Sequence, residues 1–153
     1  MQDIDKIFAL QKLTSEQKTK IAKISHLRAY KAGELIYNYG QASAIYAISK
    51  GSVALYKRNE NQVERIRVFD KGTIFGCEAL AEIKERHHFA RTCEESELLV
   101  FLGDDIEQLT LYDSFLTIHI YRAAITSLSL TMEQLAQQYT DLTHQLIDSD
   151  IIL

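Results

Sequence analysis

Lys71-Gly-Thr-Ile-Phe-Gly-Cys-Glu-Ala-Leu80, followed after a short loop by Arg86-His87-His88, is the stretch around which this chain is organised. It has the pattern of a strand end, a glycine turn, one short helical turn, a loop and a new strand. A glycine that opens a helical turn lets several backbone N–H groups point at one spot, and such a spot suits a phosphate. Arg86 would supply the opposite charge. The alternative is a purely structural strand-turn-strand with a solvated arginine, and spacing alone leaves both interpretations open.

Composition and charge set the class of protein. The chain has 153 residues, 46% of them hydrophobic and 25% charged, which is enough material for one sizeable core. Its net charge of -4 gives no overall basic field for a polyanion, so we expect no nucleic-acid partner. The sequence shows neither a secretion signal nor an apolar run of membrane-spanning length, and Cys77 and Cys93 make no disulfide framework. We therefore expect a cytoplasmic protein with no membrane partner.

Two short helices are predicted at the N-terminus. The apolar residues at helical spacing in the first of them are Ile4, Ile7, Phe8 and Leu10. Thr14 and Gln17 resemble a capping box that opens the second helix. That helix is expected to bury Ile21, Ile24 and Leu27.

From His26 to Phe101 the pattern changes to short segments rich in tyrosine, isoleucine and valine, interrupted by glycines. Turns recur about every ten residues, which indicates an antiparallel β-sandwich or barrel. Asn59-Glu60-Asn61 is the predicted tip of a hairpin. Strands are predicted near 35–39, 44–49, 52–58, 63–69, 88–93 and 97–102.

The chain becomes helical again after Gly103. Asp104 and Asp105 suit the start of a helix that contains Ile106 and Leu109. A longer helix follows, with a heptad seam formed by Ile118, Tyr121, Ile125, Leu128, Met132, Leu135, Tyr139, Leu142 and Leu146. Such a helix, of about 30 residues, would be about 45 Å long, and a small barrel cannot cover that length. We therefore expect a homodimer through residues 115–146, the alternative being a helix that lies only on its own barrel.

The order of these features resembles the cyclic-nucleotide-binding domain family, and in particular the sensor domain of catabolite-activator-type bacterial regulators. The segments with the resemblance are Lys31-Ala-Gly-Glu34, Gly40, Ile48-Ser-Lys-Gly51 with Val53, Phe69-Asp-Lys-Gly-Thr-Ile-Phe-Gly76 and Glu94-Glu-Ser-Glu-Leu-Leu99. The resemblance implies an α+β fold: an antiparallel jelly-roll barrel (a double-stranded β-helix) with short N-terminal helices and a long C-terminal dimerisation helix. The barrel with its N-terminal helices would span residues 1–103, and residues 104–153 would form the helical dimerisation segment of the same domain. Transcription factors of the family continue into a helix-turn-helix, which this chain lacks before Leu153, so we expect a stand-alone sensor or adaptor.

The family's phosphate-binding cassette has the pattern Phe-Gly-Glu-x-Ala-Leu, followed after a loop by Arg-Ser/Thr-Ala. In the family, the glycine and the helical turn hold the cyclic phosphate, the arginine pairs with it, and the glutamate binds the ribose 2′-hydroxyl. The residues that match are Phe75, Gly76, Ala79, Leu80 and Arg86. The resemblance also aligns Thr131 with a hydroxyl that the family's long helix offers to the base. A cyclic mononucleotide, cAMP or cGMP, is therefore the candidate ligand.

The cassette departs from this pattern in ways that disfavour the nucleotide. Cys77 replaces the ribose-binding glutamate, which should weaken binding by about 1.5–3 kcal/mol. His87 and His88 replace the Ser/Thr-Ala pair. Glu78 is one residue away from the missing carboxylate, but an α-helical register would turn it outward, so we do not expect it to substitute. With Glu78 and two further glutamates, Glu82 and Glu85, crowding an anion site, a different small ligand or none at all stays open.

A metal or haem site is the third interpretation of the same loop. Cys77, His87 and His88 offer a thiolate and two imidazoles. Adjacent histidines on a strand face opposite sides, however, so we expect no metal here. The sequence also contains no Ser-His-Asp ordering, paired-carboxylate motif or Walker loop, and we expect no enzyme. Two hypotheses remain: a ligand-responsive homodimer, and a degenerate domain that serves as a scaffold for an unknown protein partner.

Overall fold

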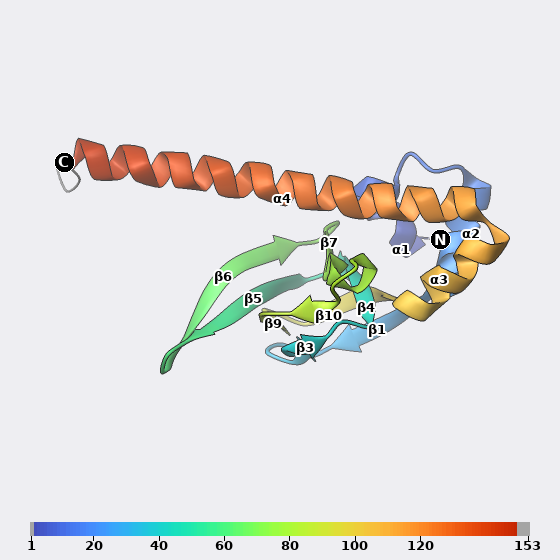
Figure 1. Cartoon of the computed structure of the whole chain (residues 1–153), viewed down its shortest axis with the longest axis horizontal. Coiled ribbons are helices and arrows are strands. Elements are labelled where there is room, and N and C mark those ends of the chain that lie inside the picture. The colour runs from blue at the N-terminus through green and yellow to red at the C-terminus, as the bar shows by residue number, and fades with distance from the viewer. Residues whose placement is uncertain (1, 150–153) are drawn as a thin grey trace.

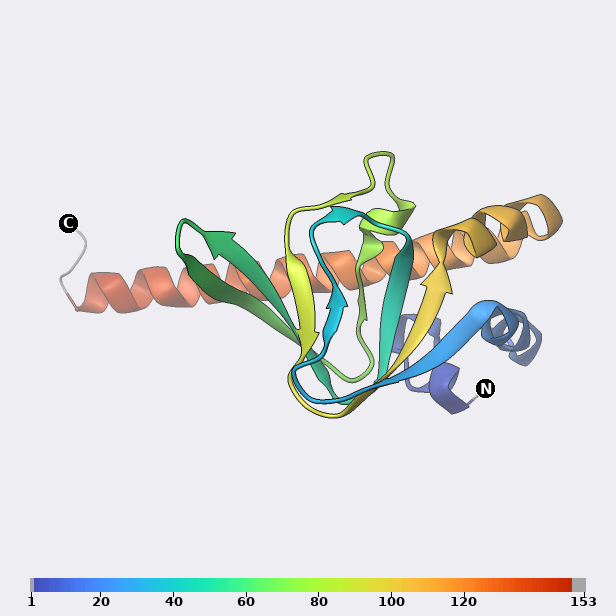
Figure 2. The same ribbon diagram turned by 90° about the horizontal axis from the view of Figure 1, so that it is seen from below.

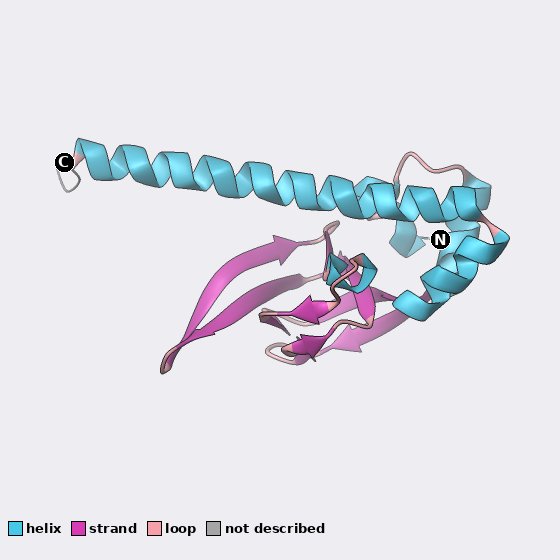
Figure 3. Ribbon diagram, viewed as in Figure 1, coloured by secondary structure: helices cyan, strands magenta, loops and turns pink. Residues whose placement is uncertain are grey.

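Antiparallel sheets with a long helix along one side make up the computed structural model, which describes residues 2–149 (Figures 1 and 3). The predicted segments beginning at residue 1 and ending at residue 153 therefore extend slightly outside the described residues. The helical elements are α1 (Gln2–Asp5), η1 (Phe8–Leu10), α2 (Ser15–Ile24), η2 (Cys77–Leu80), α3 (Gly103–Tyr112) and α4 (Ser114–Asp148). The strands are β1 (Ser25–Tyr30), β2 (Leu35–Tyr37), β3 (Gly40–Gln41), β4 (Ala44–Lys50), β5 (Ser52–Asn59), β6 (Gln62–Asp70), β7 (Ile74–Phe75), β8 (Glu85–Arg86), β9 (Phe89–Thr92) and β10 (Ser96–Leu102).

Two four-stranded sheets and one two-stranded ribbon form the framework. Their strand orders are β1-β10-β4-β7, β2-β9-β5-β6 and β3-β8, with all pairs antiparallel. The ladders of the described residues do not join the sheets into one hydrogen-bonded ring, so the barrel is open. The predicted α+β jelly-roll architecture is confirmed.

The central strands β4 and β10 are buried on both faces, and alternate residues enter two different cores. Ile45 and Ala47 of β4 face a core shared with the helices, whereas Tyr46 and Ile48 face the interior between the two large sheets. This follows from the period of two in a strand, which sends successive side chains to opposite faces. Helices cover one face of the first sheet and the second sheet covers the other, so both faces need apolar residues.

The six predicted strands correspond to β2, β4, β5, β6, β9 and β10, each to within about two residues. The hairpin tip is also confirmed. The last pair of the β5–β6 ladder is Asn59 opposite Gln62, and Glu60 in the turn between them has a φ of +54°. The prediction for Leu27 is wrong. Leu27 lies in β1, opposite Leu99 on an edge of the sheet, and it is 51% exposed. Its spacing of three residues from Ile24 is the spacing of a helical face, but the helix ends at Ile24, where the chain enters the sheet.

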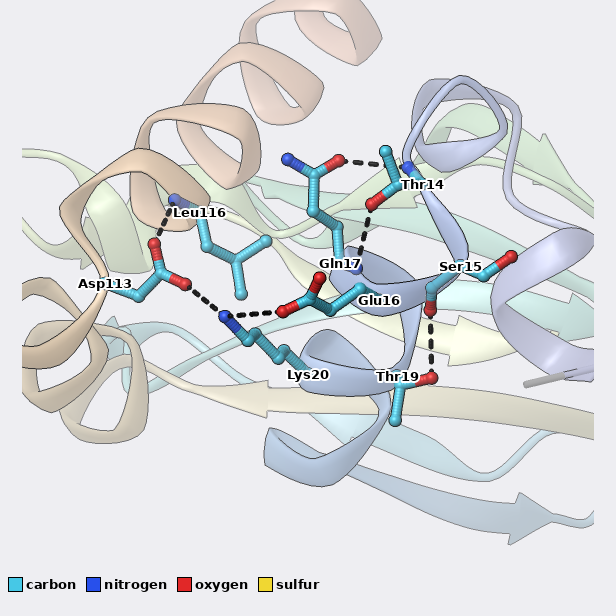
Figure 4. A network of polar contacts seen from close by, with 8 residues as sticks. All are labelled: Thr14, Ser15, Glu16, Gln17, Thr19, Lys20, Asp113 and Leu116. Carbon is cyan, nitrogen blue, oxygen red and sulfur yellow. Dashed lines mark hydrogen bonds and ion pairs between the residues drawn. The ribbon is translucent and has the colours of Figure 1, made fainter.

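Figure 4 shows how α2 is capped and linked to the start of α4. The predicted capping box is present: Gln17 N donates to Thr14 Oγ1 at 3.2 Å, and Thr14 N donates to Gln17 Oε1 at 3.0 Å. Lys20 of α2 pairs with Asp113 at 3.0 Å, and Asp113 accepts the Leu116 N–H at 3.0 Å as the N-cap of α4. The predicted helix from Asp104 and Asp105 is confirmed as α3. These contacts join α2 to the first turn of α4.

The long helix α4 is buried against the domain only in its first half, although Gln134 and Gln138 further along still contact Arg67 of β6. Its 35 residues correspond to about 52 Å. Its buried residues are Leu116, Thr117, Ile120, Ala123, Ala124 and Ser127, and beyond Ser127 none of its described residues is buried. Figures 1 and 2 show the second half running alongside the β5–β6 hairpin, with the C-terminal end of the helix extending past the sheets. Among the described residues, no helix has the length and apolarity needed to cross a membrane.

The heptad seam is a different face of α4 from the one that packs on the sheets. Its first eight positions, from Ile118 to Leu142, are between 38% and 73% exposed. The alternative in which the seam serves only to cover its own barrel therefore does not describe this chain. The seam is a continuous apolar stripe that the domain leaves uncovered.

Candidate ligand-binding cassette

The cassette begins at a glycine turn whose conformation requires glycine. Gly76 lies in the left-handed region, with φ +76° and ψ +29°, and it opens the single 3₁₀ turn of η2. A Cβ at this position would lie 3.0 Å from Arg86 Nη1 and 3.1 Å from the Tyr46 ring. The backbone therefore lies so close to Arg86 and Tyr46 that a side chain at this position would be crowded. The turn predicted from the sequence is present, and it lies directly beside Arg86.

Arg86 is buried and held on three sides. Only 2% of it is exposed, which differs from the solvated arginine of the structural interpretation. Nη1 donates to Glu78 Oε2 at 2.6 Å, and Nη2 donates to the Ala44 carbonyl at 2.5 Å. The guanidinium carbon lies 3.8 Å from the centre of the Tyr37 ring, in cation–π contact. The positive charge predicted for the cassette is thus in place, but an internal carboxylate already neutralises it.

Glu78 turns inward, contrary to the expectation from an α-helical register. The turn is 3₁₀, with about three residues per turn, so the direction of its second residue differs from that in an α-helix. The carboxylate pairs with the arginine, and its side chain stays 31% exposed. It accepts from Nη1 of the guanidinium, and arginine binds carboxylates and phosphates through the same N–H groups.

The two histidines lie in the bend between β8 and β9 and not on a strand as predicted, and they differ in burial. His87 is exposed, whereas His88 is partly buried, with Nε2 at 2.6 Å from the Tyr37 hydroxyl and 3.7 Å from Glu78 Oε1. Burial lowers the pKa of His88, and this outweighs the opposite effect of the Glu78 carboxylate. The neutral ring can then accept the Tyr37 O–H, whose own pKa burial raises. His88 therefore adds no positive charge for an anion at neutral pH.

Cys77 is a buried thiol rather than a metal ligand in this arrangement. It is 9% exposed, and burial raises its pKa to about 12. A thiolate is the form that binds metals, so such a thiol is a poor ligand. Within residues 2–149 no group of three histidine, cysteine, aspartate or glutamate side chains is placed to hold a metal ion.

Aromatic rings occupy the interior beside Arg86. Tyr37, Tyr46 and Phe75 are in mutual contact, with ring centroids 5.3–6.3 Å apart, and Phe69 stacks on Phe75 at 5.8 Å. Offset ring contacts at such distances are favourable. This aromatic cluster (Tyr37, Tyr46, Phe69 and Phe75) fills space on the barrel side of the cassette.

The other predicted site residues lie apart from the arginine. Ala79 is buried in the helix-side core, and Leu80 packs against that core. Thr131 Oγ1 donates to the Ser127 carbonyl of its own helix at 3.0 Å, and Thr131 lines a groove between β6 and α4. Sequence reasoning missed Tyr37 and Tyr46. The only signal for them was an aromatic at an inward position of a short strand, which is also the pattern of an ordinary core residue.

The domain combines a sandwich of antiparallel sheets, a glycine-opened turn beside a buried arginine and a long C-terminal helix. Comparison with known proteins identifies the family that has this combination. The family profile of the cyclic nucleotide-binding domain matches residues 27–113, which is more than half of the chain. The chain therefore belongs to the cyclic nucleotide-binding domain family. No curated protein sequence matches it closely enough to count as a relative.

Solved structures show the same fold at low sequence identity. A cyclic nucleotide-binding domain from Methylobacillus flagellatus KT is 15% identical with a TM-score of 0.74, and the match covers 80% of this chain and 70% of that one. The catabolite activator protein of Thermus thermophilus is 22% identical with a TM-score of 0.65, covering 92% of this chain and 62% of that one. The c-di-GMP responsive global regulator of Xanthomonas campestris is 20% identical with a TM-score of 0.72, and the match covers 85% of this chain and 65% of that one.

Proposed function

We propose that this chain is a homodimeric, ligand-sensing regulatory domain whose phosphate-binding cassette is closed at rest by its own Glu78. The observation that supports this most directly is the pairing of Glu78 with the buried Arg86 at 2.6 Å. Arg86, which matches the arginine that the family pairs with the phosphate, is present and buried, and the Glu78 carboxylate would occupy the position proposed for the phosphate. The domain would be regulatory rather than catalytic, and would act in the cytoplasm without binding nucleic acid or a membrane.

An effector would have to displace Glu78 from Arg86. A buried arginine tolerates the loss of its carboxylate only if another anion replaces it. A cyclic mononucleotide, cAMP or cGMP, is the candidate effector, because its phosphate could accept the same N–H groups and those of the turn from Gly76 to Leu80. Release of Glu78 from Arg86 would also break the contact between Glu78 and His88, so ligand binding would change the loop between these two residues. We infer that Cys77 makes the ribose contact weaker than in relatives with a glutamate there.

The output would pass through α4. Ser127 of α4 donates to the Ile74 carbonyl at 2.6 Å, one residue before Phe75 and the cassette. The exposed seam supports a parallel homodimer through residues 115–146, so a shift at Ile74 would be felt at the dimer interface. The contact between Ser127 and Ile74 supports this route from the cassette to α4.

The test compares Glu78→Gln with the unmodified chain in titration calorimetry against cAMP, cGMP and c-di-GMP. Glutamine keeps an acceptor for Arg86 but removes the competing charge, so affinity for the cyclic nucleotide should rise about tenfold, the equivalent of one charge-assisted hydrogen bond of about 1.5 kcal/mol. Glu82→Gln is the matched control, because it removes an equal charge from an exposed position of the same loop. It should change affinity far less.

A second candidate function is an interaction scaffold that binds no nucleotide. The aromatic cluster favours it, because Tyr37, Tyr46 and Phe75 already fill space beside the arginine. If neither the unmodified chain nor Glu78→Gln nor Cys77→Glu binds any of the three nucleotides while all stay folded, the sensor proposal fails and the scaffold function is preferred.

A further inference from the structure

The sheet β2-β9-β5-β6 has an outer face as well as the face that lines the barrel. Leu55 and Ala90 belong to the interior between the two large sheets, so their neighbours Tyr56 and Phe89 point outward. Tyr56 and Phe89 are opposite each other on β5 and β9, and their rings stack with centroids 5.3 Å apart. This outer face is separate from the cassette, whose arginine contacts rings of the barrel interior.

Two arginines are held against the Phe89 ring. The guanidinium carbon of Arg58 lies 4.8 Å from the centre of this ring, and that of Arg91 lies 5.8 Å from it. Arg58 also lies 5.1 Å from the centre of the Tyr39 ring, and its backbone N–H donates to the Tyr39 hydroxyl at 2.9 Å. Phe89 is only 5% exposed although it lies on the outer face, because these side chains cover it. The cation–π contacts restrict each arginine in advance, so it loses less freedom on binding a partner.

These two positive charges have no internal counter-charge. In the part of the chain that the structure describes, no carboxylate lies within ion-pair distance of Arg58 or Arg91. Within residues 2–149 the Arg58 guanidinium donates no hydrogen bond, and the Arg91 guanidinium donates only one, from Nη1 to the Gly33 carbonyl at 3.1 Å. Arg86 differs, because Glu78 neutralises it. The charge of the arginine pair is therefore available to an external anion, although the net charge of the whole chain is -4.

Exposed valines lie beside the arginines on the same face. Val63 of β6 is opposite Arg58 and is 58% exposed. Val68 of β6 is opposite Ala54, which pairs on its other side with Arg91, and Val68 is 38% exposed. Directly opposite residues of an antiparallel pair share one face of the sheet. Arginine and aromatic residues next to apolar ones are typical of protein–protein interfaces. We call these residues the arginine surface: Tyr39, Arg58, Val63, Val68 and Arg91.

The chemistry of this surface favours a protein partner over a nucleic acid. Guanidinium groups already lie against the Tyr39 and Phe89 rings, so these rings do not offer the free faces on which single-stranded bases stack. Carboxylates suit the forked N–H groups of arginine. We propose that the arginine surface binds an acidic segment of a partner protein. Carboxylates of that segment pair with Arg58 and Arg91, and its apolar side chains pack on Val63 and Val68. This binding does not depend on a ligand in the cassette.

The test titrates two fluorescein-labelled peptides of equal length into the intact protein and measures fluorescence anisotropy. The acidic probe has three repeats of Asp-Glu-Leu-Glu, and the neutral probe has three repeats of Asn-Gln-Leu-Gln. We expect saturable binding of the acidic peptide that weakens as salt is added, and at least tenfold weaker binding of the neutral peptide. Arg58→Gln should weaken the acidic peptide at least tenfold. Arg58→Lys should fall between, because lysine keeps the charge but loses the planar fork.

Matched controls separate this surface from other causes. Lys57→Gln removes an equal charge from the adjacent exposed residue, which points to the other face of β5, so it should change affinity less than twofold. Glu78→Gln should leave affinity unchanged, which separates the surface from the cassette. Because Arg58 covers Phe89, circular dichroism verifies that each variant is folded, and Arg91→Gln provides a second variant that should weaken the acidic peptide. No saturable binding, equal affinity for the neutral peptide, or indifference of folded Arg58→Gln and Arg91→Gln would each overturn the proposal.

Two further probes examine the other possible partners of a cationic surface. Oligothymidylate of the same length stands for single-stranded nucleic acid, and vesicles of phosphatidylcholine with phosphatidylserine stand for an anionic membrane. Both should bind at least tenfold more weakly than the acidic peptide. If either probe binds as tightly as the peptide and loses affinity in Arg58→Gln, the assignment to a protein segment is overturned.

Discussion

Charges introduced into the exposed seam of α4 should abolish dimerisation. Leu128 and Leu135 are 55% and 45% exposed in the single chain, so about half of each side chain is available for burial. Complete burial of a leucine stabilises by about 1.5–3 kcal/mol, which gives about 0.8–1.5 kcal/mol for each half. A symmetric dimer contains four such leucines, and together they contribute about 3–6 kcal/mol.

The double variant Leu128→Glu with Leu135→Glu should therefore raise the dimer dissociation constant by a factor of about 10² to 10⁴. Repulsion among the new carboxylates adds to this loss. Sedimentation equilibrium over a micromolar concentration series measures the constant directly. Because neither residue belongs to the buried face of α4, circular dichroism should show an unchanged fold.

The matched control is Thr126→Glu with Thr140→Glu. These residues are exposed on α4 outside the seam, and each hydroxyl donates only to its own helix. The control adds the same charge to the same helix and should remain dimeric. A monomeric unmodified chain at micromolar concentration, or a dimeric Leu128→Glu/Leu135→Glu variant, would refute the seam as the interface.

Three further outcomes are expected. Burial lowers the pKa of His88 below its ordinary value of 6.5, so the unfolded chain binds more protons and the free energy of unfolding should fall as pH drops from 7 through 6.5 toward the folded pKa. Urea denaturation at several pH values should show a shallower decline for His88→Gln than for the unmodified chain. An identical decline would argue against the assignment. In the native protein, Ellman's reagent should modify exposed Cys93 rapidly. Burial raises the pKa of Cys77 to about 12, so this thiol should stay unmodified until urea is added. A fast reaction in the Cys93→Ser variant would contradict this. Thr14→Ala should reduce stability by about 1 kcal/mol through loss of the capping box, measured by the same denaturation, whereas Thr19→Ala within α2 should have a smaller effect.

The sequence by itself determined the elements whose signals are local. Short segments rich in tyrosine, isoleucine and valine, separated by turn residues, are sufficient to predict β4, β5, β6 and β10, because β-branched and aromatic residues favour strands locally. The capping box of Thr14 and Gln17 needs only a spacing of three residues. The seam of α4 could be predicted because nine positions that are apolar or tyrosine repeat along one helix. The turn at Gly76 could be predicted because only glycine accepts its backbone conformation without strain.

Only the tertiary structure decided what the cassette side chains contact. Glu78, Arg86 and Tyr37 come from η2, β8 and β2, and Ala44 from β4, so their meeting depends on how non-adjacent elements pack. The same holds for Leu27, whose helical spacing was overruled by pairing of β1 with β10. The groove at Arg67 likewise exists only because α4 crosses over β6. Patterns along a chain report which face of an element is apolar, whereas the partner of a buried charge is fixed by the three-dimensional arrangement that must satisfy it.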